Sequence, residues 1–368
     1  MHTRQGRQME NHQDNYYGEF VPQNEKVISV LDKEFLTTDD VSLVPRQGVL
    51  SSRSEAILKP FIYSSPMDTV TGLQLTSKMR EMGHYPVVCR FLKEEWTQTL
   101  QAHSNDPNVF FAVGTKEWYT AERLSIFDTP VSINIDIAHG DTIEVQKLYE
   151  QYANEPYVGY LMSGSICTPE AALRAVNSGC THLRIGIGPG SACTTRLKTG
   201  CGVPQLSAVY LIHRELERAG LRDQVELIAD GGVRNPGDAV KYLAAGADSI
   251  MMGNRFAPTI ESAGWEEDFS GKLVKKYRGQ ASADFQKDHY NKQPDCAEGA
   301  TSNDFTIPLY SAERVIKEFE GGVRSAISYL GLENINELTP DNVTFIKVTA
   351  SAIQEAKPHG TTQTNMYW

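Results

Sequence analysis

The stretch VELIADGGVRNPGDAVKYLAAGADSIMMG, at residues 225–253, contains the unit from which the fold can be inferred. Residues 225–230 form a β-rich run, and two glycines follow it. Residues 235–246 then place apolar side chains three and four positions apart and end on a glycine, which indicates a helix. A second β-rich run follows at residues 248–253. This order of strand, helix and strand indicates two parallel strands joined by a crossover helix.

The same alternation of β-rich runs and helical segments extends over most of the chain. Eight such runs are present, at residues 61–65, 85–89, 109–113, 130–138, 157–164, 181–187, 225–230 and 248–253. Eight strand–helix units within roughly 200 residues predict a closed (β/α)8 barrel, the TIM-barrel architecture of the α/β class. An open, doubly wound sheet is the alternative that the same alternation allows.

The other parts of the chain divide around this barrel. We expect three regions: an N-terminal tail or arm at residues 1–35, a barrel domain at 36–350 and a C-terminal tail at 351–368. Within the barrel domain, residues 254–310 are charged and show little periodicity, which is typical of a long active-site lid. Residues 311–331 have helical periodicity interrupted by Gly321 and Gly322, and they would supply the C-terminal helices.

Composition argues against several classes of function. The chain has 368 residues, is 40% hydrophobic and carries a formal net charge of −11, which argues against a general nucleic-acid binder. It has no run of about 18 apolar residues, so we expect no membrane span. Its six cysteines show neither CxxC nor zinc-site spacing, which indicates reduced thiols and a cytoplasmic location.

Glycines follow two neighbouring strands at the edge where a barrel of this kind has its active site. Asp230, Gly231 and Gly232 end the seventh run, and Gly253 and Asn254 end the eighth. Loops after these strands commonly bind phosphate through backbone N–H groups, and Asp230 would accept hydrogen bonds from sugar hydroxyls. The pattern therefore predicts a sugar-phosphate site, with simple turn geometry as the alternative explanation of the glycines.

One cysteine lies in a glycine-rich loop after the sixth run, in GIGPGSACTT at residues 186–195. A structural cysteine is usually buried among apolar side chains, whereas Cys193 has small residues and hydroxyls as its sequence neighbours. Backbone N–H groups in such a loop would stabilise the thiolate, which is the reactive form. We therefore expect Cys193 to be a nucleophile, with Thr194 and Thr195 as candidates for proton relay.

The same loop resembles that of a known family. GIGPGSACTTRLKTGCGVPQLSAV, at residues 186–209, is similar to the signature of the inosine monophosphate dehydrogenase and guanosine monophosphate reductase family. Supporting matches run from Leu36 to about Val348 and include INIDIAHGD at residues 133–141. The resemblance implies a (β/α)8 barrel in which Cys193 forms a covalent bond to C2 of a purine ring.

Three features make the chain more similar to the reductase branch of that family. Only about 20 residues separate the second and third runs, so the regulatory insert that most dehydrogenases carry there is absent. TTRLKTGCGVPQLSAV, at residues 194–209, resembles the reductase form. Residues 283–300 contain Tyr290 but no arginine, whereas dehydrogenases use an arginine–tyrosine pair on the lid. A dehydrogenase without the insert, and a catalytically silent purine-nucleotide binder, are the alternatives.

The resemblance implies reductive deamination of GMP, or of a close analogue, by NADPH to give IMP and ammonia. Cys193 would attack C2, while Thr195 and Glu298 would protonate the departing amino group. The implied nucleotide contacts are Ser191, Asp230, Gly231, Gly232, Gly253, Asn254 and Ser282. The implied cofactor contacts are Ser52 and Arg53 from a neighbouring subunit of a homotetramer, together with Arg90, Asp136, Ile137, Ala138, Ser325 and Ser328. A monovalent cation, K⁺, would bind carbonyl oxygens of Gly188, Gly190 and Cys193.

Three departures from the family pattern concern the substrate. Cys89 and Arg90 stand where the reductase has His-Lys, and Ser165 stands where it has asparagine. Asp295 replaces an arginine three positions before Glu298, and a carboxylate there would repel a phosphate instead of binding it. The substrate therefore stays open between GMP, its deoxy form and another purine nucleotide.

Overall fold

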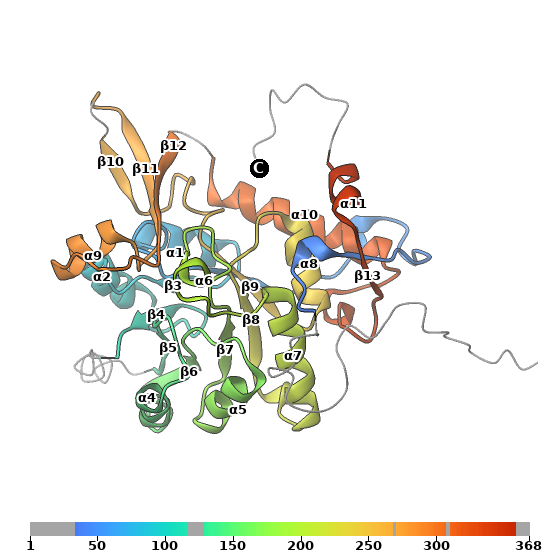
Figure 1. The fold of residues 1–368 in the computed structure, drawn as a ribbon, viewed down its shortest axis with the longest axis horizontal. Coiled ribbons are helices and arrows are strands. Elements are labelled where there is room, and N and C mark those ends of the chain that lie inside the picture. Colours follow the sequence, from blue (N-terminus) through green and yellow to red (C-terminus); the bar gives the residue numbers. More distant parts are fainter. Residues whose placement is uncertain (1–33, 116–128, 268–269, 307–309, 358–368) are drawn as a thin grey trace, which may run out of the picture.

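The computed structural model describes residues 34–115, 129–267, 270–306 and 310–357 (Figure 1). The expected N-terminal tail lies outside the described residues, apart from residues 34 and 35. The expected C-terminal tail is described as far as residue 357, and Ala350–Glu355 form the short helix α11. The remaining described residues form the barrel and the elements attached to it.

The described residues include one sheet of eight parallel strands. These are β2 (Ile62–Ser64), β3 (Val87–Val88), β4 (Phe110–Val113), β5 (Val131–Ile135), β6 (Val158–Met162), β7 (His182–Ile185), β8 (Glu226–Asp230) and β9 (Ser249–Met252). Consecutive strands from β3 to β9 pair with each other, β9 pairs with β2, and a parallel bridge joins Tyr63 to Tyr85 just before β3. The sheet thus closes as a (β/α)8 barrel, so the predicted fold is confirmed and the open-sheet alternative is wrong.

Helices connect these strands and cover the outside of the barrel (Figure 1). In the described residues they are α1 (Leu73–Glu81), α2 (Lys93–His103), α4 (Ile143–Ala153), α5 (Pro169–Asn177), α7 (Gln205–Arg218), α8 (Pro236–Ala244) and α10 (Ala312–Tyr329). Thr168 Oγ1 accepts a hydrogen bond from Ala171 N and begins α5, whose first residue is a proline. None of the described helices is both long enough and apolar enough to cross a lipid bilayer.

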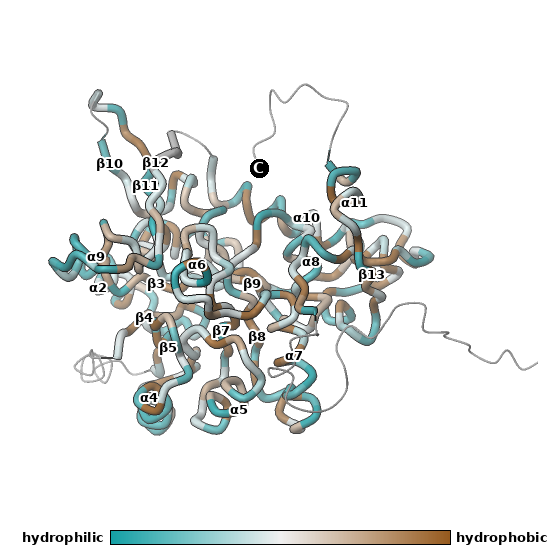
Figure 2. Tube along the Cα trace, in the orientation of Figure 1, coloured by the Kyte–Doolittle hydropathy of each residue, from teal (hydrophilic) through white to brown (hydrophobic). Residues whose placement is uncertain are grey.

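The barrel strands are apolar on both faces because helices cover one face and the barrel interior closes on the other. In β8, Leu227 and Ala229 pack with the surrounding helices, whereas Ile228 packs inside the barrel near Met251. Hydrophobic segments accordingly gather along the central strands in Figure 2. The same alternation directs Asp230, two positions after Ile228, into the mouth of the barrel.

Short elements complete the described chain. β1 (Val41–Leu43) pairs antiparallel with β13 (Phe345–Lys347), and the single-turn helix α6 (Thr195–Thr199) follows the Cys193 loop. Turns of 3-10 helix lie at Thr38–Asp40, Arg53–Glu55, Arg222–Gln224 and Ile335–Glu337.

Residues 254–310, expected from their weak periodicity to form a lid, contain regular structure of their own. β10 (Trp265–Glu267), β11 (Leu273–Arg278) and β12 (Thr301–Thr306) form an antiparallel sheet that stands out from the barrel in Figure 1, and α9 (Ala283–Tyr290) follows β11. These elements are short and rich in charged residues, which explains the weak periodicity. Arg278 Nε donates to Asp68 Oδ2 at 3.0 Å, so this segment is tied to the loop after β2.

Helix α10 runs without a break from Ala312 to Tyr329, so the expected interruption at Gly321 and Gly322 is wrong. A Cβ atom added at Gly322 would lie 2.2 Å from Cβ of Pro236, the first residue of α8. A Cβ atom added at Gly321 would meet no atom within 4 Å. Gly322 therefore permits a close approach of α8 and α10, and the pair of glycines does not mark the end of a helix.

We expect the two glycines to respond in opposite directions to alanine. Gly321→Ala should raise the free energy of unfolding by about 0.5–1 kcal/mol, because alanine is the better helix former and the site has space. Gly322→Ala should lower it by about 1–3 kcal/mol, because the added methyl group overlaps Pro236. Urea unfolding of both variants measures the two shifts, and shifts of the same sign would contradict the packing explanation.

Candidate active site

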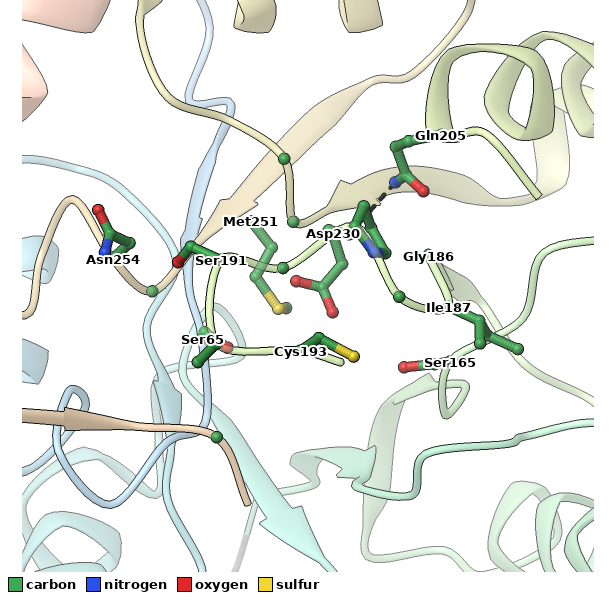
Figure 3. Close-up of a pocket in the computed structure, with 18 of the residues that line it drawn as sticks. Ser65, Ser165, Gly186, Ile187, Ser191, Cys193, Gln205, Asp230, Met251 and Asn254 are labelled. Atoms are coloured by element: carbon green, nitrogen blue, oxygen red, sulfur yellow. Dashed lines mark hydrogen bonds between the residues drawn. The ribbon is translucent and has the colours of Figure 1, made fainter. Parts of the chain in front are cut away.

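A cavity of about 520 Å³ opens at the strand ends where the sequence predicted the site (Figure 3). Its walls come from the loops after β2, β7, β8 and β9, and from residues of the segment above the barrel such as Gln280 and Glu298. A cavity of this volume suits a ligand of nucleotide size. Cys193 and Ser165 project into it from two loops, and Asp230 projects into it from the end of β8 (Figure 3).

The Cys193 loop is joined by main-chain hydrogen bonds to the segment that carries Glu298. Thr194 N donates to Glu298 O at 2.7 Å, and Cys193 lies opposite Gly299 in a short antiparallel bridge. Cys193 and Glu298 both line the cavity. The structure therefore brings the expected nucleophile and the expected carboxyl to one cavity, although 105 residues separate them in the chain.

Thr195 completes the expected catalytic set. It is the first residue of α6, and its Oγ1 accepts a hydrogen bond from Cys193 Sγ at 3.2 Å. Cys193 is partly exposed, as attack on a ligand requires. A hydroxyl in direct contact with the sulfur can pass a proton between the thiol and a bound ligand.

The glycine turn after β8 has a backbone conformation that favours glycine. Gly231 and Gly232 have φ angles of 87° and 73°, in the left-handed region. A Cβ atom at Gly231 would lie 3.0 Å from Gly190 N, so this turn packs directly against the Cys193 loop. The two turns that the sequence indicated for phosphate and for the nucleophile thus form adjoining walls of one cavity.

Two hydroxyls lie beside the second glycine turn. Ser191 Oγ and Tyr277 Oη are 3.1 Å apart, and a Cβ atom at Gly253 would lie 3.5 Å from Tyr277 Oη. Burial raises the pKa of Tyr277 to about 12, so the phenol remains a hydrogen-bond donor at neutral pH. The sequence analysis predicted Ser191 and Gly253 here but missed Tyr277.

A partly buried arginine lies between two aspartates in the barrel mouth. Arg184 Nε donates to Asp230 Oδ2 at 2.6 Å, and Arg184 Nη1 donates to Asp136 Oδ1 at 3.1 Å. Burial works against the charged form, but Asp230 and Asp136 outweigh it and raise the pKa of Arg184. Sequence analysis missed this residue. An arginine at an interior position of a barrel strand was the signal that could have found it.

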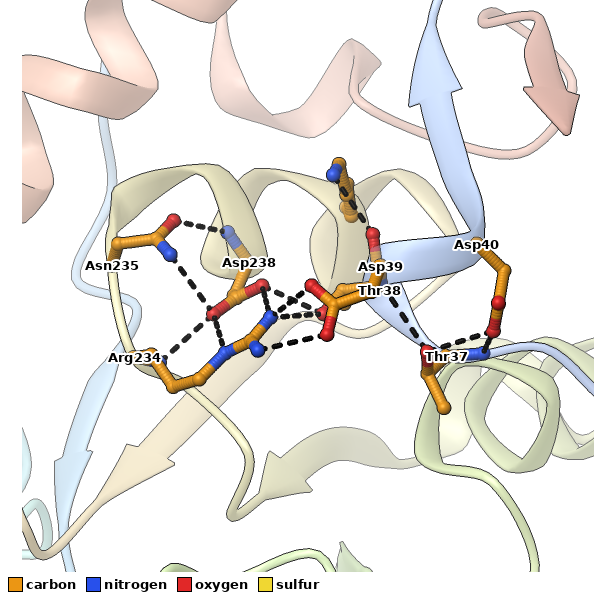
Figure 4. A network of polar contacts seen from close by, with 8 residues as sticks. Thr37, Thr38, Asp39, Asp40, Arg234, Asn235 and Asp238 are labelled. Carbon is orange, nitrogen blue, oxygen red and sulfur yellow. Dashed lines mark hydrogen bonds and ion pairs between the residues drawn. The ribbon is translucent and has the colours of Figure 1, made fainter. Parts of the chain in front are cut away.

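A polar network beside the cavity supports the first glycine turn (Figure 4). Arg234, which follows the turn, pairs with Asp39 at 2.6 Å and with Asp238 at 2.9 Å. Thr38 Oγ1 donates to Asp238 Oδ1 at 2.6 Å, and Thr37 caps the 3-10 helix that carries Asp39. The hydrogen bond from Arg234 lowers the pKa of Asp39. The segment before β1 is thereby held against α8, where it lines one side of the cavity.

The expected nucleotide contacts reach the cavity wall with one exception. Those that line it are Ser191, Asp230, Gly231, Gly232, Gly253 and Asn254. Ser282 is buried, and its Oγ accepts a hydrogen bond from Phe285 N at 3.3 Å as the cap of α9. The structure therefore gives the Ser282 hydroxyl a capping contact and does not include it in the cavity wall.

The expected cofactor contacts fall into two groups. The first follows β3 and β5 near the cavity: Ala138 lines it, and Arg90 Nε lies 3.6 Å from Asp136 Oδ2. The second group consists of Ser52, Arg53, Ser325 and Ser328, none of which lines the cavity. Arg53 Nη1 donates to Ser325 Oγ at 3.0 Å, so these residues, distant in sequence, share one surface.

The three residues that depart from the family pattern lie at different places relative to the cavity. Ser165 lines the cavity, where its hydroxyl can meet a ligand. Cys89 is buried, and burial raises the pKa of its thiol well above the usual value. Asp295 is exposed and does not line the cavity, so its carboxylate is not set against a ligand bound there.

The residues expected to hold a monovalent cation fit that role. Among the described residues, nothing donates a hydrogen bond to the carbonyl oxygens of Gly188 and Cys193, whereas Gly190 O accepts one from Cys193 N at 2.9 Å. Each carbonyl oxygen therefore keeps at least one lone pair for a cation. The described part of the chain has no group of three or more His, Cys, Asp or Glu side chains that could hold a metal ion.

The fold is that of a (β/α)8-barrel protein, and a cysteine, Cys193, lines the cavity at its strand ends. A family model described as "IMP dehydrogenase / GMP reductase domain" matches residues 32–359, and the chain belongs to that family. It is therefore an oxidoreductase of purine-nucleotide metabolism in a family that uses nicotinamide cofactors.

Relatives from both branches of the family are similar to the chain. Inosine-5'-monophosphate dehydrogenase of Borreliella burgdorferi is 31% identical over 405 aligned residues, which cover 89% of this chain and 98% of that protein. GMP reductase of Streptococcus gordonii is 30% identical over 331 residues, which cover 86% of this chain and 96% of that protein. Inosine-5'-monophosphate dehydrogenase of Halalkalibacterium halodurans is 36% identical over 241 residues, and this chain spans about half of its length, 47%. These comparisons establish the family but not the branch.

Proposed function

We propose that the protein reduces a guanine nucleotide, GMP or a close analogue, with NADPH and releases IMP and ammonia. The observation that carries this proposal is the position of Glu298, whose main chain is hydrogen-bonded to the Cys193 loop. Thr195 Oγ1 lies 3.2 Å from the Cys193 sulfur in the same cavity. Departure of an amino group from C2 needs proton donors beside the nucleophile, and these two side chains are of the required type.

In the proposed reaction, Cys193 Sγ forms a bond to C2 of the purine as the π bond between C2 and N3 breaks. The thiol proton is relayed through Thr195 Oγ1, which releases its own proton toward the amino nitrogen as it accepts. The bond between C2 and the amino nitrogen then breaks, and the nitrogen leaves as ammonia with a proton delivered through Thr195 and Glu298. The hydride that reduces C2 is what NADPH supplies when it is bound. The bond between carbon and sulfur breaks last, which frees IMP and the thiolate. One hydride and one proton are consumed for each ammonia released.

The nucleotide would be held at both ends of the cavity. The backbone N–H group of Gly232, with the hydroxyls of Ser191 and Tyr277, suits a phosphate, whereas Gly231 N already donates to Met251 O at 3.3 Å. Asp230 Oδ2 already accepts from Arg184, whereas no described residue donates to Asp230 Oδ1, which leaves that oxygen for a sugar hydroxyl.

The cofactor would be held by two copies of the chain. Asp136, Ile137, Ala138 and Arg90 would contact it beside the cavity, and Ser52, Arg53, Ser325 and Ser328 would reach it from a neighbouring subunit. This arrangement agrees with the position of the second group away from its own cavity. A homotetramer, a K⁺ ion in the Cys193 loop and a cytoplasmic location are proposed with it on the family resemblance.

Oxidation of IMP by NAD⁺ is the second candidate function. Dehydrogenases from Borreliella burgdorferi and Aquifex aeolicus match 89% and 91% of this chain, and this favours that candidate. The absence of arginine from residues 283–300 argues against it. A catalytically silent nucleotide binder has no need of a thiol, a hydroxyl and a carboxyl around one cavity.

A panel of purine nucleotides offered with each cofactor separates these candidates. We expect NADPH to be oxidised with GMP or its deoxy form, as followed by the absorbance of the reduced nicotinamide, and no appreciable reduction of NAD⁺ with IMP. Ammonia release measured in parallel should equal the NADPH consumed. Robust formation of XMP from IMP and NAD⁺ would overturn the branch assignment, and no turnover with any pair would favour the silent binder.

We also propose that residues 254–310 close over the bound nucleotide, because Tyr277 and Glu298 from this segment line the cavity. Closure should then protect the segment from proteases. Limited proteolysis is expected to cut within it in the free protein and to slow several-fold with saturating GMP. Equal rates of cleavage with and without nucleotide would count against closure.

A further inference from the structure

Gln280, the second residue after β11, links the segment above the barrel to two loops of the barrel itself. Its Nε2 donates to Pro66 O, after β2, at 2.7 Å and to Asp136 Oδ2, after β5, at 2.8 Å. Its main-chain oxygen accepts a hydrogen bond from Gln286 Nε2 of α9 at 3.0 Å. Gln280 also lines the cavity. One side chain therefore joins three parts of the site that are far apart in sequence.

The orientation of the Gln280 amide follows from its partners. Both Pro66 O and Asp136 Oδ2 are acceptors, so the NH₂ group and not the carbonyl oxygen must face them. Both amide protons are thereby used, and the side chain is held in one rotamer. Methionine has a similar length but no donor, so it would keep the packing and lose both hydrogen bonds.

The carboxylate that Gln280 contacts is buried and is the first member of a chain of three charged side chains. Asp136 Oδ1 accepts from Arg184, and Arg184 Nε donates to Asp230 Oδ2. Asp230 belongs to the nucleotide end of the cavity and Asp136 to the cofactor end in the proposed function. A movement of the β11 segment that displaces Gln280 would remove one of the donors to Asp136 and leave this chain of charges less well held.

We propose that Gln280 is a positioning residue that couples nucleotide binding to cofactor binding. β11 also carries Tyr277, whose phenol lies at the expected phosphate end. A nucleotide that contacts Tyr277 fixes the position of β11. It therefore also holds Gln280, three positions later, against Asp136. Asp136, held in place by Gln280, then keeps the cofactor end of the cavity in the geometry that binds NADPH. The proposal rests on the proposed function, because it takes Asp136 as part of the cofactor site.

The coupling is measurable with a pair of ligands that cannot exchange a hydride. Binding of NADPH is measured with and without saturating IMP, in the native protein, in Gln280→Met and in Gln286→Met. We expect IMP to tighten NADPH binding by roughly tenfold in the native protein, within the usual range of coupling between sites. The coupling ratio is the dissociation constant of NADPH without IMP divided by that with IMP. In Gln280→Met this ratio should fall to about one, while the affinity for IMP alone changes less than about threefold. Gln286→Met is the matched control, because it removes a hydrogen bond to Gln280 without touching Asp136, and it should keep the native ratio.

An isosteric substitution that adds a negative charge at the contact provides a readout that packing alone would not change. Gln280→Glu keeps the size of the side chain but removes both donated hydrogen bonds and sets a second carboxylate beside Asp136, so the coupling should be lost in this variant too. A native ratio in Gln280→Met, or a ratio of one in the native protein, would overturn the proposal. Failure of the proposed function is seen separately, because the nucleotide panel would then show no oxidation of NADPH by any guanine nucleotide.

Discussion

Cys193→Ala should abolish turnover while leaving nucleotide binding within a few-fold of the native value. The thiol lines the cavity and contacts Thr195 Oγ1 at 3.2 Å, and in the proposed reaction it supplies the covalent bond on which every later step depends. Loss of a catalytic nucleophile commonly lowers kcat by about 10⁴-fold or more. The variant removes only a sulfur atom from the cavity wall, so the phosphate and sugar contacts are unchanged. NADPH oxidation and equilibrium binding of GMP measure the two effects.

Cys201→Ala is the matched control for this experiment. Cys201 lies eight residues further along the same segment, is exposed and does not line the cavity. Its replacement should change kcat by less than about twofold, as is usual for surface substitutions away from the site. Comparable turnover in Cys193→Ala and the native protein would contradict the covalent mechanism. Equal loss in both variants would indicate that the segment, and not the sulfur, is what catalysis requires.

The barrel was predictable because its determinants are local in the sequence. Each β-rich run lies next to a segment with helical spacing, and caps such as Thr168 act within three residues of themselves. The glycine turns at Gly231 and Gly253 were predictable for the same reason, since a turn is recognised from its own residues. Their meeting in one cavity followed from the general rule that parallel strands end at the same edge of the barrel.

Contacts between distant residues were not predictable in this way. Arg184 meets Asp230 across 46 positions, Ser191 meets Tyr277 across 86, and Gln280 meets Asp136 across 144. Nothing in the neighbouring sequence of Arg184 indicates that two carboxylates surround it in the folded chain. Such pairings depend on the register of the strands and on where residues 254–310 pack against the barrel. Both are properties of the whole fold.

One local interpretation was misled by a residue whose role is set elsewhere in the fold. Gly321 and Gly322 were expected to interrupt a helix, but Gly322 permits a close contact with Pro236 on another helix. Ser282 stays a predicted substrate contact by resemblance, and its hydroxyl also caps α9. Glycine and serine serve both kinds of purpose, and a single sequence does not separate them.

Glu298→Gln should slow release of ammonia far more than it weakens nucleotide binding. Glutamine preserves the size and the hydrogen-bonding capacity of the side chain, and the main-chain bond from Thr194 N to residue 298 is unaffected. It cannot give and take a proton, and loss of a general acid typically costs about 10²–10⁴-fold in rate. We expect kcat for NADPH oxidation with GMP to fall within that range, with GMP affinity changed less than about tenfold.

A control variant and the order of the chemical steps test whether the effect of Glu298→Gln comes from the lost proton donor. Asp295→Asn removes a carboxylate three positions away that is exposed and does not line the cavity, so it should leave kcat near the native value. In Glu298→Gln the bond between Cys193 and C2 can still form, because the thiol and Thr195 are intact, but the amino group leaves slowly. Mass spectrometry of the protein mixed with GMP should therefore show more nucleotide attached to Cys193 than in the native protein. Native kcat in Glu298→Gln would show that the proton comes from another group and would leave Thr195 as the remaining candidate donor beside the sulfur.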